Sequence, residues 1–291
     1  MKKAALAIIL LSALSISSCK KDSKDEDTPS GGTPAPSGKC LTTALKSGSI
    51  PYFTWGYDAN RNLSLMVTYD DQSGKQMSSI AYLYDGGKLN KETKTEFESD
   101  GVTISDVSYF LYNYNSNGTI NKVTAYNSVN EFKGYTEYIY DGSKLTKMQS
   151  YDENSAAGGY TTFEYTSTTL TSVSTWDQNN VKTGITRYDG SGNVMSVNSI
   201  DDQQIEHIQF QFEYDMSKSN YIGETLLKML TGQMTLTPKN AIKRLKVYDG
   251  GSLTDDISFE YLNFTSNGYP TVVATTDNSV VTQYTLEYSC N

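Results

Sequence analysis

A tyrosine just before a turn signal recurs along this chain, and this repeat constrains the fold more than any other feature. The aligned residues are Tyr84, Tyr114, Tyr140, Tyr165, Tyr188, Tyr214, Tyr261 and Tyr288. From Tyr84 onward the gaps are 30, 26, 25, 23, 26, 47 and 27 residues. Apart from the gap of 47, the period is about 26 residues, which indicates one supersecondary unit copied many times.

Each unit is predicted to be a β-hairpin. Asp-Gly lies between two alternating runs at residues 85–86 and again at 141–142. Asp-Gly favours a two-residue hairpin turn, because both turn residues need a positive φ. Asn117-Gly118 has more residues between its flanking runs and predicts a longer loop.

The runs between the turns alternate with a period of two. In residues 208–214, IQFQFEY, the apolar side chains share one face and Gln, Gln and Glu share the other; residues 257–261 and 284–288 repeat the pattern. Such alternation is typical of half-buried antiparallel strands. We therefore predict an all-β fold of antiparallel hairpin repeats with about 16 strands, most of them about eight to ten residues long.

The chain has 23 tyrosines, and the repeat gives most of them a structural role. Rings at equivalent positions of neighbouring hairpins are expected to form cross-strand ladders on the buried face. A minority of the aromatic residues would instead form a glycan-binding platform. Trp55 and Trp176 are the candidate ligand-binding residues for that platform.

The gap of 47 residues contains the one helical pattern. Ile222, Leu226, Met229 and Leu230 fall at helical spacing in this segment, and Gly232 follows them. We predict one short amphipathic helix over about 222–231, inserted between two hairpins.

Three cysteines bear on closure of the sheet. If Cys19 carries lipid, Cys40 and Cys290 remain, at the two ends of the region predicted to fold. A disulfide between them would place the termini side by side and stabilise the fold by about 4–5 kcal/mol in the chain-entropy model. The alternative is two unpaired thiols.

A sheet of this many strands must protect its edges, which favours a closed barrel. A transmembrane porin needs an apolar outward band, whereas one face of most strands here is Ser, Thr, Gln, Glu and Lys. A wide barrel with an apolar interior would be hollow, which protein interiors are not. We therefore predict a closed or flattened barrel-like sheet, or one whose interior is filled by helix 222–231.

The N-terminus predicts export. Residues 1–18 have two lysines, an apolar run and then small residues, which is the order of a secretory signal peptide. Ile16-Ser17-Ser18-Cys19 resembles the lipobox of bacterial lipoproteins. The resemblance implies cleavage before Cys19, acylation of that cysteine and a lipid anchor in the outer membrane. The alternative is an ordinary signal peptide that contains a cysteine.

Residues 19–39 are charged and then rich in Pro, Gly and Ser, which predicts a disordered tether ahead of a domain over 40–291. The lysine and acidic cluster after Cys19 is similar to the export signal of Bacteroidetes surface lipoproteins. That resemblance implies display on the cell exterior. The alternatives are a linker without an addressing role and a location on the periplasmic face.

Two family resemblances follow from the hairpins. Tyr-Asp-Gly at 84–86 and 140–142, with the lipobox and the acidic tether, is similar to a family of Bacteroidetes surface lipoproteins of unknown function. That resemblance implies a porin-like barrel fold and a surface location, but no activity. The motif also resembles the Tyr-Asp repeats of bacterial toxin-encapsulating shell proteins, whose usual Gly-Arg-Leu appears here only as Gly87-Lys88-Leu89.

Charge limits the partners. The formal net charge of −9 becomes −11 (−9 − 2) once Lys2 and Lys3 are removed, so the chain should repel nucleic acid. The expected partners are the outer membrane, through Cys19, and a glycan or surface protein. No cofactor is expected.

Catalytic constellations are not visible in the sequence. His207 is the only histidine and falls on the polar face of its run, where we expect a solvated residue. The pairs Asp70-Asp71, Asp201-Asp202 and Asp255-Asp256 fall at predicted strand ends, where paired carboxylates would bind Ca²⁺ or act on glycosidic bonds. We expect a non-catalytic binding module for glycan or protein, ahead of a structural or assembly component of the outer-membrane surface and, last, a hydrolase.

Overall fold

The computed structural model describes residues 40–219 and 238–290, and every regular element in these ranges is a β-strand. The 18 strands are β1 (Cys40–Ser47), β2 (Ile50–Tyr57), β3 (Leu63–Tyr69), β4 (Gln76–Asp85), β5 (Lys88–Phe97), β6 (Ile104–Tyr114), β7 (Ile120–Asn127), β8 (Phe132–Asp141), β9 (Lys144–Tyr151), β10 (Ala157–Thr166), β11 (Thr169–Trp176), β12 (Lys182–Tyr188), β13 (Val194–Ile200), β14 (Glu206–Ser219), β15 (Asn240–Asp249), β16 (Ser252–Phe264), β17 (Pro270–Asp277) and β18 (Val280–Cys290).

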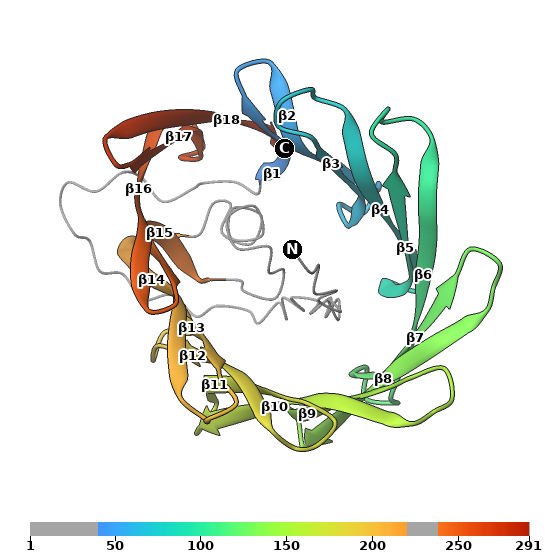
Figure 1. Ribbon diagram of the computed structural model, residues 1–291. Helices are drawn as coiled ribbons and strands as arrows, with labels where there is room; N and C mark the ends of the chain where they lie inside the picture. Colours follow the sequence, from blue (N-terminus) through green and yellow to red (C-terminus); the bar gives the residue numbers. More distant parts are fainter. Residues whose placement is uncertain (1–39, 220–237, 291) are drawn as a thin grey trace, which may run out of the picture.

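Each strand pairs antiparallel with the next in the chain, and β1 pairs with β18, so the sheet closes on itself. Figure 1 shows the strands as a ring viewed along its axis. The predicted closed all-β barrel is therefore confirmed. Cys40 and Cys290 lie where β1 begins and β18 ends. We call this end of the barrel the disulfide end and the opposite end the far end.

The short hairpin turns lie one residue later than predicted. Asp85 pairs with Lys88, and the two turn residues are Gly86 and Gly87, with φ of 56° and 77°. Asp141 and Lys144 pair in the same way around Gly142. Two consecutive positive φ values suit glycine better than aspartate, so the aspartate stays in the strand. The predicted longer loop after Tyr114 is confirmed, with the Gly118 amide donating to the Asn115 carbonyl.

The repeating tyrosines lie at the disulfide end. Among the described residues, six tyrosine hydroxyls on even-numbered strands each donate a hydrogen bond to a backbone carbonyl of the preceding strand. The accepting carbonyl lies near the start of that strand. These bonds are Tyr57 to Thr42, Tyr114 to Leu89, Tyr165 to Leu145, Tyr214 to Val194, Tyr261 to Ile242 and Tyr288 to Pro270, at 2.7–3.0 Å. Each bond ties two neighbouring strands together beside the backbone ladder.

The face that carries these tyrosines is the more buried one, as expected for the concave side of a closed barrel, and we call it the inner face. One apolar cluster on it runs from β13 through β18 to β2 and includes Leu45, Leu245 and Leu286, each 2 % exposed or less. A second cluster, around Tyr112 and Val123, covers β4 to β8. The predicted inner surface of tyrosines is thus confirmed for the rings near the ends of the even-numbered strands. The prediction that cross-strand ring pairs lie on this face is wrong for three direct pairs, which lie on the outer face.

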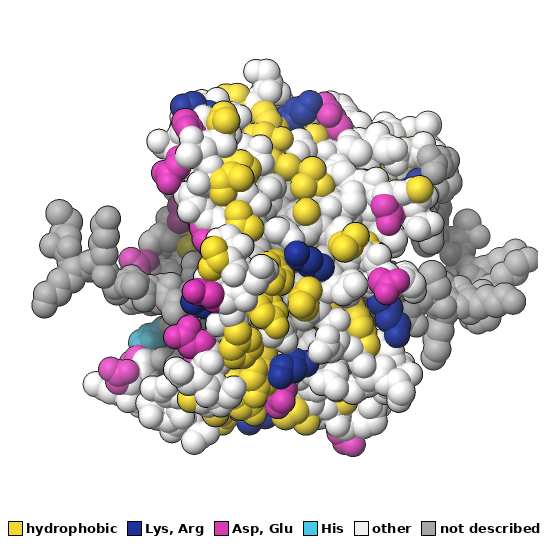
Figure 2. Space-filling model, turned by 90° about the vertical axis from the view of Figure 1, so that its right-hand side faces the viewer, with side chains coloured by type: hydrophobic (Ala, Val, Ile, Leu, Met, Phe, Trp, Pro, Cys, Tyr) yellow, Lys and Arg dark blue, Asp and Glu magenta, His cyan; other side chains and the backbone are white. Residues whose placement is uncertain are grey.

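The outer face has two regions that differ in their ion pairs, although both expose apolar side chains, such as Leu253 on β16 and Val281 on β18. On the strands from β12 to β1 it carries ion pairs, including Arg187–Glu206 at 2.7 Å and Arg244–Asp256 at 2.5 Å. On β3 to β8 it exposes apolar side chains: Leu65, Met77, Leu83 and Ile139. Figure 2 looks onto the side formed by β4 to β8 and shows hydrophobic side chains gathered in a band, with separate basic side chains among them.

Two predicted features differ from the structure or fall outside it. The strand count is 18 rather than about 16, because the first hairpin, β1–β2, ends in Tyr57-Asp58 followed by Ala and Asn instead of Gly. The predicted helix over 222–231 lies outside the described residues. Within 40–219 and 238–290 there is no helix long and apolar enough to cross a membrane.

Candidate functional site

The outer face carries a repeated arrangement of one lysine and two aromatic rings. It occurs three times, on β5–β6–β7, β7–β8–β9 and β9–β10–β11. The three triads are Lys91–Tyr109–Tyr126, Lys122–Tyr135–Tyr151 and Lys147–Tyr160–Trp176. We call these nine residues the outer-wall strip.

Strand register explains why the triad repeats. In each triad the two rings are direct cross-strand partners: Tyr109 opposite Tyr126, Tyr135 opposite Tyr151, and Tyr160 opposite Trp176.

The lysine lies on the preceding strand, always with the same offset. It is opposite the residue two positions after the first ring, so that Lys91 pairs with Leu111, Lys122 with Glu137 and Lys147 with Thr162. Diagonal neighbours of this kind are within reach of a long side chain.

The rings stack nearly parallel. In chain order the ring centroids of the three pairs are 5.0, 4.5 and 5.6 Å apart, with interplanar angles of 12°, 15° and 8°. Each lysine Nζ lies over the first ring of its triad, at 4.1, 3.4 and 4.1 Å from the centroid. These are cation–π distances, and exposed pairs of this kind contribute about 0.5–1 kcal/mol each.

All nine side chains of the outer-wall strip are half-buried, so each ring keeps part of its surface open to solvent. Small or polar residues lie between them on the same face. Thr124 and Gln149 are buried, and Gln149 donates from Nε2 to the Gly158 carbonyl at 3.0 Å. The strip is therefore a shallow aromatic surface on a hydrogen-bonded β-sheet.

The electrostatics of the strip favour an anion. Among the residues that the structure describes, Lys91, Lys122 and Lys147 have no carboxylate oxygen within 4.0 Å. Glu137 is an acidic side chain on the same face, beside Tyr151 and opposite Lys122 in the β7–β8 ladder. Partial desolvation and then this carboxylate raise the pKa of the Tyr151 hydroxyl.

Trp176 forms one end of the strip. Its indole N–H donates to the Thr162 hydroxyl at 3.1 Å, which fixes the plane of the ring. Lys182 Nζ lies 5.0 Å from the centroid of the same ring. The candidate ligand-binding residue Trp176 is thus part of an extended aromatic surface.

Trp55, the other candidate, is elsewhere. It packs against the inner-face cluster and stacks on Phe53 with ring centroids 5.8 Å apart. Trp55 and Trp176 therefore lie on opposite faces of the barrel wall and do not form one site.

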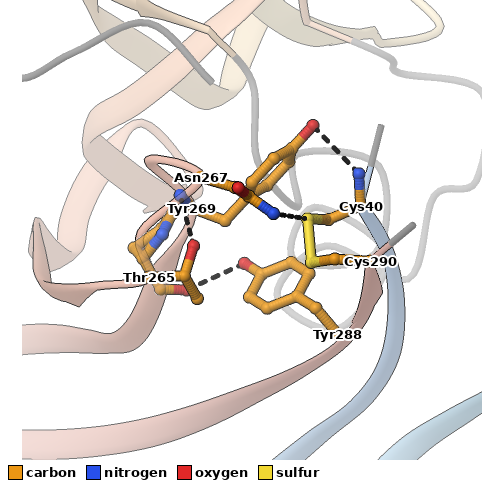
Figure 3. Close-up of a disulfide and its surroundings, with 7 residues drawn as sticks. Cys40, Thr265, Asn267, Tyr269, Tyr288 and Cys290 are labelled. Carbon is orange, nitrogen blue, oxygen red and sulfur yellow. Dashed lines mark hydrogen bonds between the residues drawn. A yellow bond between two sulfur atoms is a disulfide. The ribbon is translucent and has the colours of Figure 1, made fainter. Parts of the chain in front are cut away.

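The predicted disulfide between Cys40 and Cys290 is present, joining β1 to β18 at the closing seam. Figure 3 shows its surroundings, in which Asn267 donates to Cys40 Sγ at 3.5 Å and the Cys40 amide donates to the Tyr269 hydroxyl at 3.3 Å. Cys19, the predicted lipidation residue, lies outside the described residues, as do the proposed signal peptide and tether.

The paired carboxylates serve local structure. Asp70 and Asp201 accept backbone amides of their own loops, such as Ser73 N–H at 2.7 Å and Ile205 N–H at 2.8 Å. Asp201 also meets His207, which is partly exposed, with Oδ2 to Nε2 at 2.9 Å. The described ranges contain no group of three or more His, Cys, Asp or Glu residues arranged to hold a metal ion.

The third pair departs from its predicted place at a strand end. Asp255 and Asp256 lie inside β16, where Asp256 is the partner of Arg244. The outer-wall strip was not predicted as a unit. The sequence does contain a signal for the strip, since a lysine and two aromatic residues recur once per hairpin. Their proximity can be recognised only when the register between the strands is known.

The fold and the strip define the class: a closed, up-and-down antiparallel barrel with a half-exposed aromatic surface on its outer wall. No protein-family model matches the chain, and no curated protein does.

Porin-like proteins are among the solved structures that show likeness to the chain. A porin-like protein from Bacteroides uniformis is 16 % identical with a TM-score of 0.47, over 89 % of this chain and 99 % of that one. A porin-like protein from Bacteroides vulgatus is 13 % identical with a TM-score of 0.28, over 85 % and 98 %. At such low values no property of these proteins is carried over to this chain.

Proposed function

We propose that this protein is a lipid-anchored, non-catalytic binding module of the outer-membrane surface that holds a glycan on its outer-wall strip. The observation that carries the proposal is the threefold repeat of half-exposed stacked rings on one wall of the barrel. A pyranose ring presents C–H groups on its flat face, and these pack against the negative π-face of an aromatic side chain. A row of rings therefore suits a row of sugars.

The surface location rests on the N-terminal sequence, with its signal-like segment, Cys19 and acidic tether. The Cys40–Cys290 disulfide supports export, because such bonds persist in oxidising compartments. The ion pairs Arg187–Glu206 and Arg244–Asp256 on the outer wall support a barrel that stands in water, since lipid would require an apolar band around the whole circumference.

One observation favours a second candidate, a structural or assembly role. Two strands beside the strip, β3 and β4, and one strand within it, β8, expose Leu65, Met77, Leu83 and Ile139, which would suit a protein partner. In that case the apolar residues of β3, β4 and β8 would carry the interaction, and loss of the rings would have less effect.

The test is a glycan array followed by calorimetric titration of the best ligand, using the mature chain with Cys19→Ser to keep it free of lipid. Tyr160→Ala and Trp176→Ala are each expected to weaken binding by about five- to tenfold, since a stacked ring contributes about 1 kcal/mol beyond area burial. Tyr248→Ala is the matched control, because Tyr248 bonds to Gln211 outside the strip. A protein that binds no glycan, or that binds equally after loss of both rings, contradicts the proposal.

A further inference from the structure

The lysines of the outer-wall strip recur as regularly as its rings. Lys91, Lys122 and Lys147 stand on β5, β7 and β9 with one offset from the ring that follows each of them. A chance scatter of surface lysines would not keep the same register over three hairpins. The ligand is therefore expected to carry a repeated feature that an ammonium group recognises.

The three lysines are held in place and still have hydrogen-bonding capacity. Each Nζ lies over a ring face, which restrains the side chain without using its N–H donors for a carboxylate. An ammonium group has three donors. Charge-assisted bonds to carboxylate or sulfate are the strongest use of such donors.

The spacing fits a polymer. Successive lysines are two strands apart, which is about 10 Å across the sheet at 4.7–4.9 Å per strand. This separation is comparable to the disaccharide repeat of an extended polysaccharide. Along the same surface, aromatic rings that can pack against sugar faces alternate with ammonium groups that can bind acidic groups.

We propose that the strip binds a linear anionic polysaccharide, with its sugar rings on the stacked aromatic pairs and its carboxylate or sulfate groups on Lys91, Lys122 and Lys147. This inference rests on the proposed glycan-binding function and adds the charge of the ligand. Single-stranded nucleic acid also combines charge with stacking, so its binding is one of the outcomes that the experiment distinguishes.

The experiment compares polygalacturonate with its fully methyl-esterified form at matched length, in which each carboxylate is replaced by an uncharged methyl ester. Binding to the mature chain with Cys19→Ser is measured by titration calorimetry at low and at physiological salt. We expect polygalacturonate to bind at least tenfold more tightly than the ester, with an affinity that falls as salt rises.

The variant is the triple substitution Lys91→Gln, Lys122→Gln and Lys147→Gln, which keeps side-chain length. It is expected to reduce polygalacturonate affinity at least tenfold and to leave ester binding unchanged. The matched control, Lys75→Gln with Lys243→Gln and Lys246→Gln, removes the same charge outside the strip and should change affinity less than twofold. Near-equal thermal midpoints of the variants show that the fold is intact.

Other outcomes overturn the inference. Equal binding of acid and ester, insensitive to the strip lysines, removes the anionic specificity while leaving the proposed glycan binding intact. If neither polymer binds and no other glycan binds on the array, both the anionic specificity and the proposed glycan-binding function are wrong. Tight binding of a single-stranded oligonucleotide in their place would assign the strip to a different ligand.

Discussion

Cys40 and Cys290 are direct cross-strand partners in the β1–β18 ladder, although 250 positions separate them in the chain. The bond therefore closes the seam at which the first strand meets the last. Without it, the seam is held by the β1–β18 ladder and by side-chain contacts such as the Lys46–Glu287 ion pair.

Reduction of this disulfide is expected to destabilise the barrel by up to about 5 kcal/mol, because the unfolded chain regains the entropy of a loop of this length. The measurement is the urea midpoint of the oxidised and reduced protein, followed by far-ultraviolet circular dichroism. Cys40→Ser with Cys290→Ser should match the reduced protein. Identical midpoints for the oxidised and reduced forms would show that the ladder alone determines the stability of the seam.

Tyr214→Phe is expected to destabilise the fold by about 1–3 kcal/mol. The hydroxyl of Tyr214 donates to the Val194 carbonyl at 2.7 Å, and Val194 is fully buried. Removing the donor leaves a buried carbonyl without that partner. Tyr109→Phe is the control, because its hydroxyl bonds to the exposed Asn130, and it should cost less than about 0.5 kcal/mol. If both variants lose the same free energy of unfolding, the buried hydrogen bonds of the inner-face tyrosines contribute no more to stability than an exposed one.

Alkaline pH is expected to weaken the barrel. Burial raises the pKa of Tyr57 and of Tyr188 to about 12, from an ordinary value of 10.0. Below pH 10 both states keep the proton and stability does not depend on these groups. Between pH 10 and 12 the unfolded chain loses protons that the folded chain retains, so the free energy of unfolding falls. Urea midpoints together with tyrosinate absorbance test this expectation, and a flat profile up to pH 12 would contradict it.

Gly134→Ala is expected to destabilise the fold by about 2 kcal/mol or more. Gly134 has a φ of +125°, and a Cβ placed there would collide with the Tyr151 carbonyl oxygen on the next strand. Both backbone strain and overpacking oppose the substitution. Gly190→Ala, where a Cβ meets open space and φ is not positive, should change stability by less than about 0.5 kcal/mol. Thermal midpoints of the two variants give the comparison, and similar midpoints would refute the steric argument.

Much of the fold could be predicted because the hairpins are encoded by residues close together in the sequence. The tyrosine repeat and the period-two alternation identified the hairpins, and the positions of two cysteines indicated closure. The first hairpin was missed, because Tyr57-Asp58 lacks the following glycine, and the turn at 86–87 was placed one residue early. Both errors concern turns, where a single residue decides which positions of the turn can adopt a positive φ.

The candidate site was less predictable. Trp55 and Trp176 look alike in sequence, since each lies at or near the end of an alternating run. Their faces differ because Trp55 alternates in phase with Phe53, which belongs to the inner-face cluster, whereas Trp176 is the direct cross-strand partner of Tyr160 on the outer face.

The sequence by itself determined the all-β repeat, the alternation that separates two faces, and the cysteines that close the ring, because these depend on spacing along one chain. Only the tertiary structure decided which aromatic rings face outward and that three lysines lie diagonally beside them. Those relations depend on the register between strands, and a shift of one residue would move every side chain to the other face.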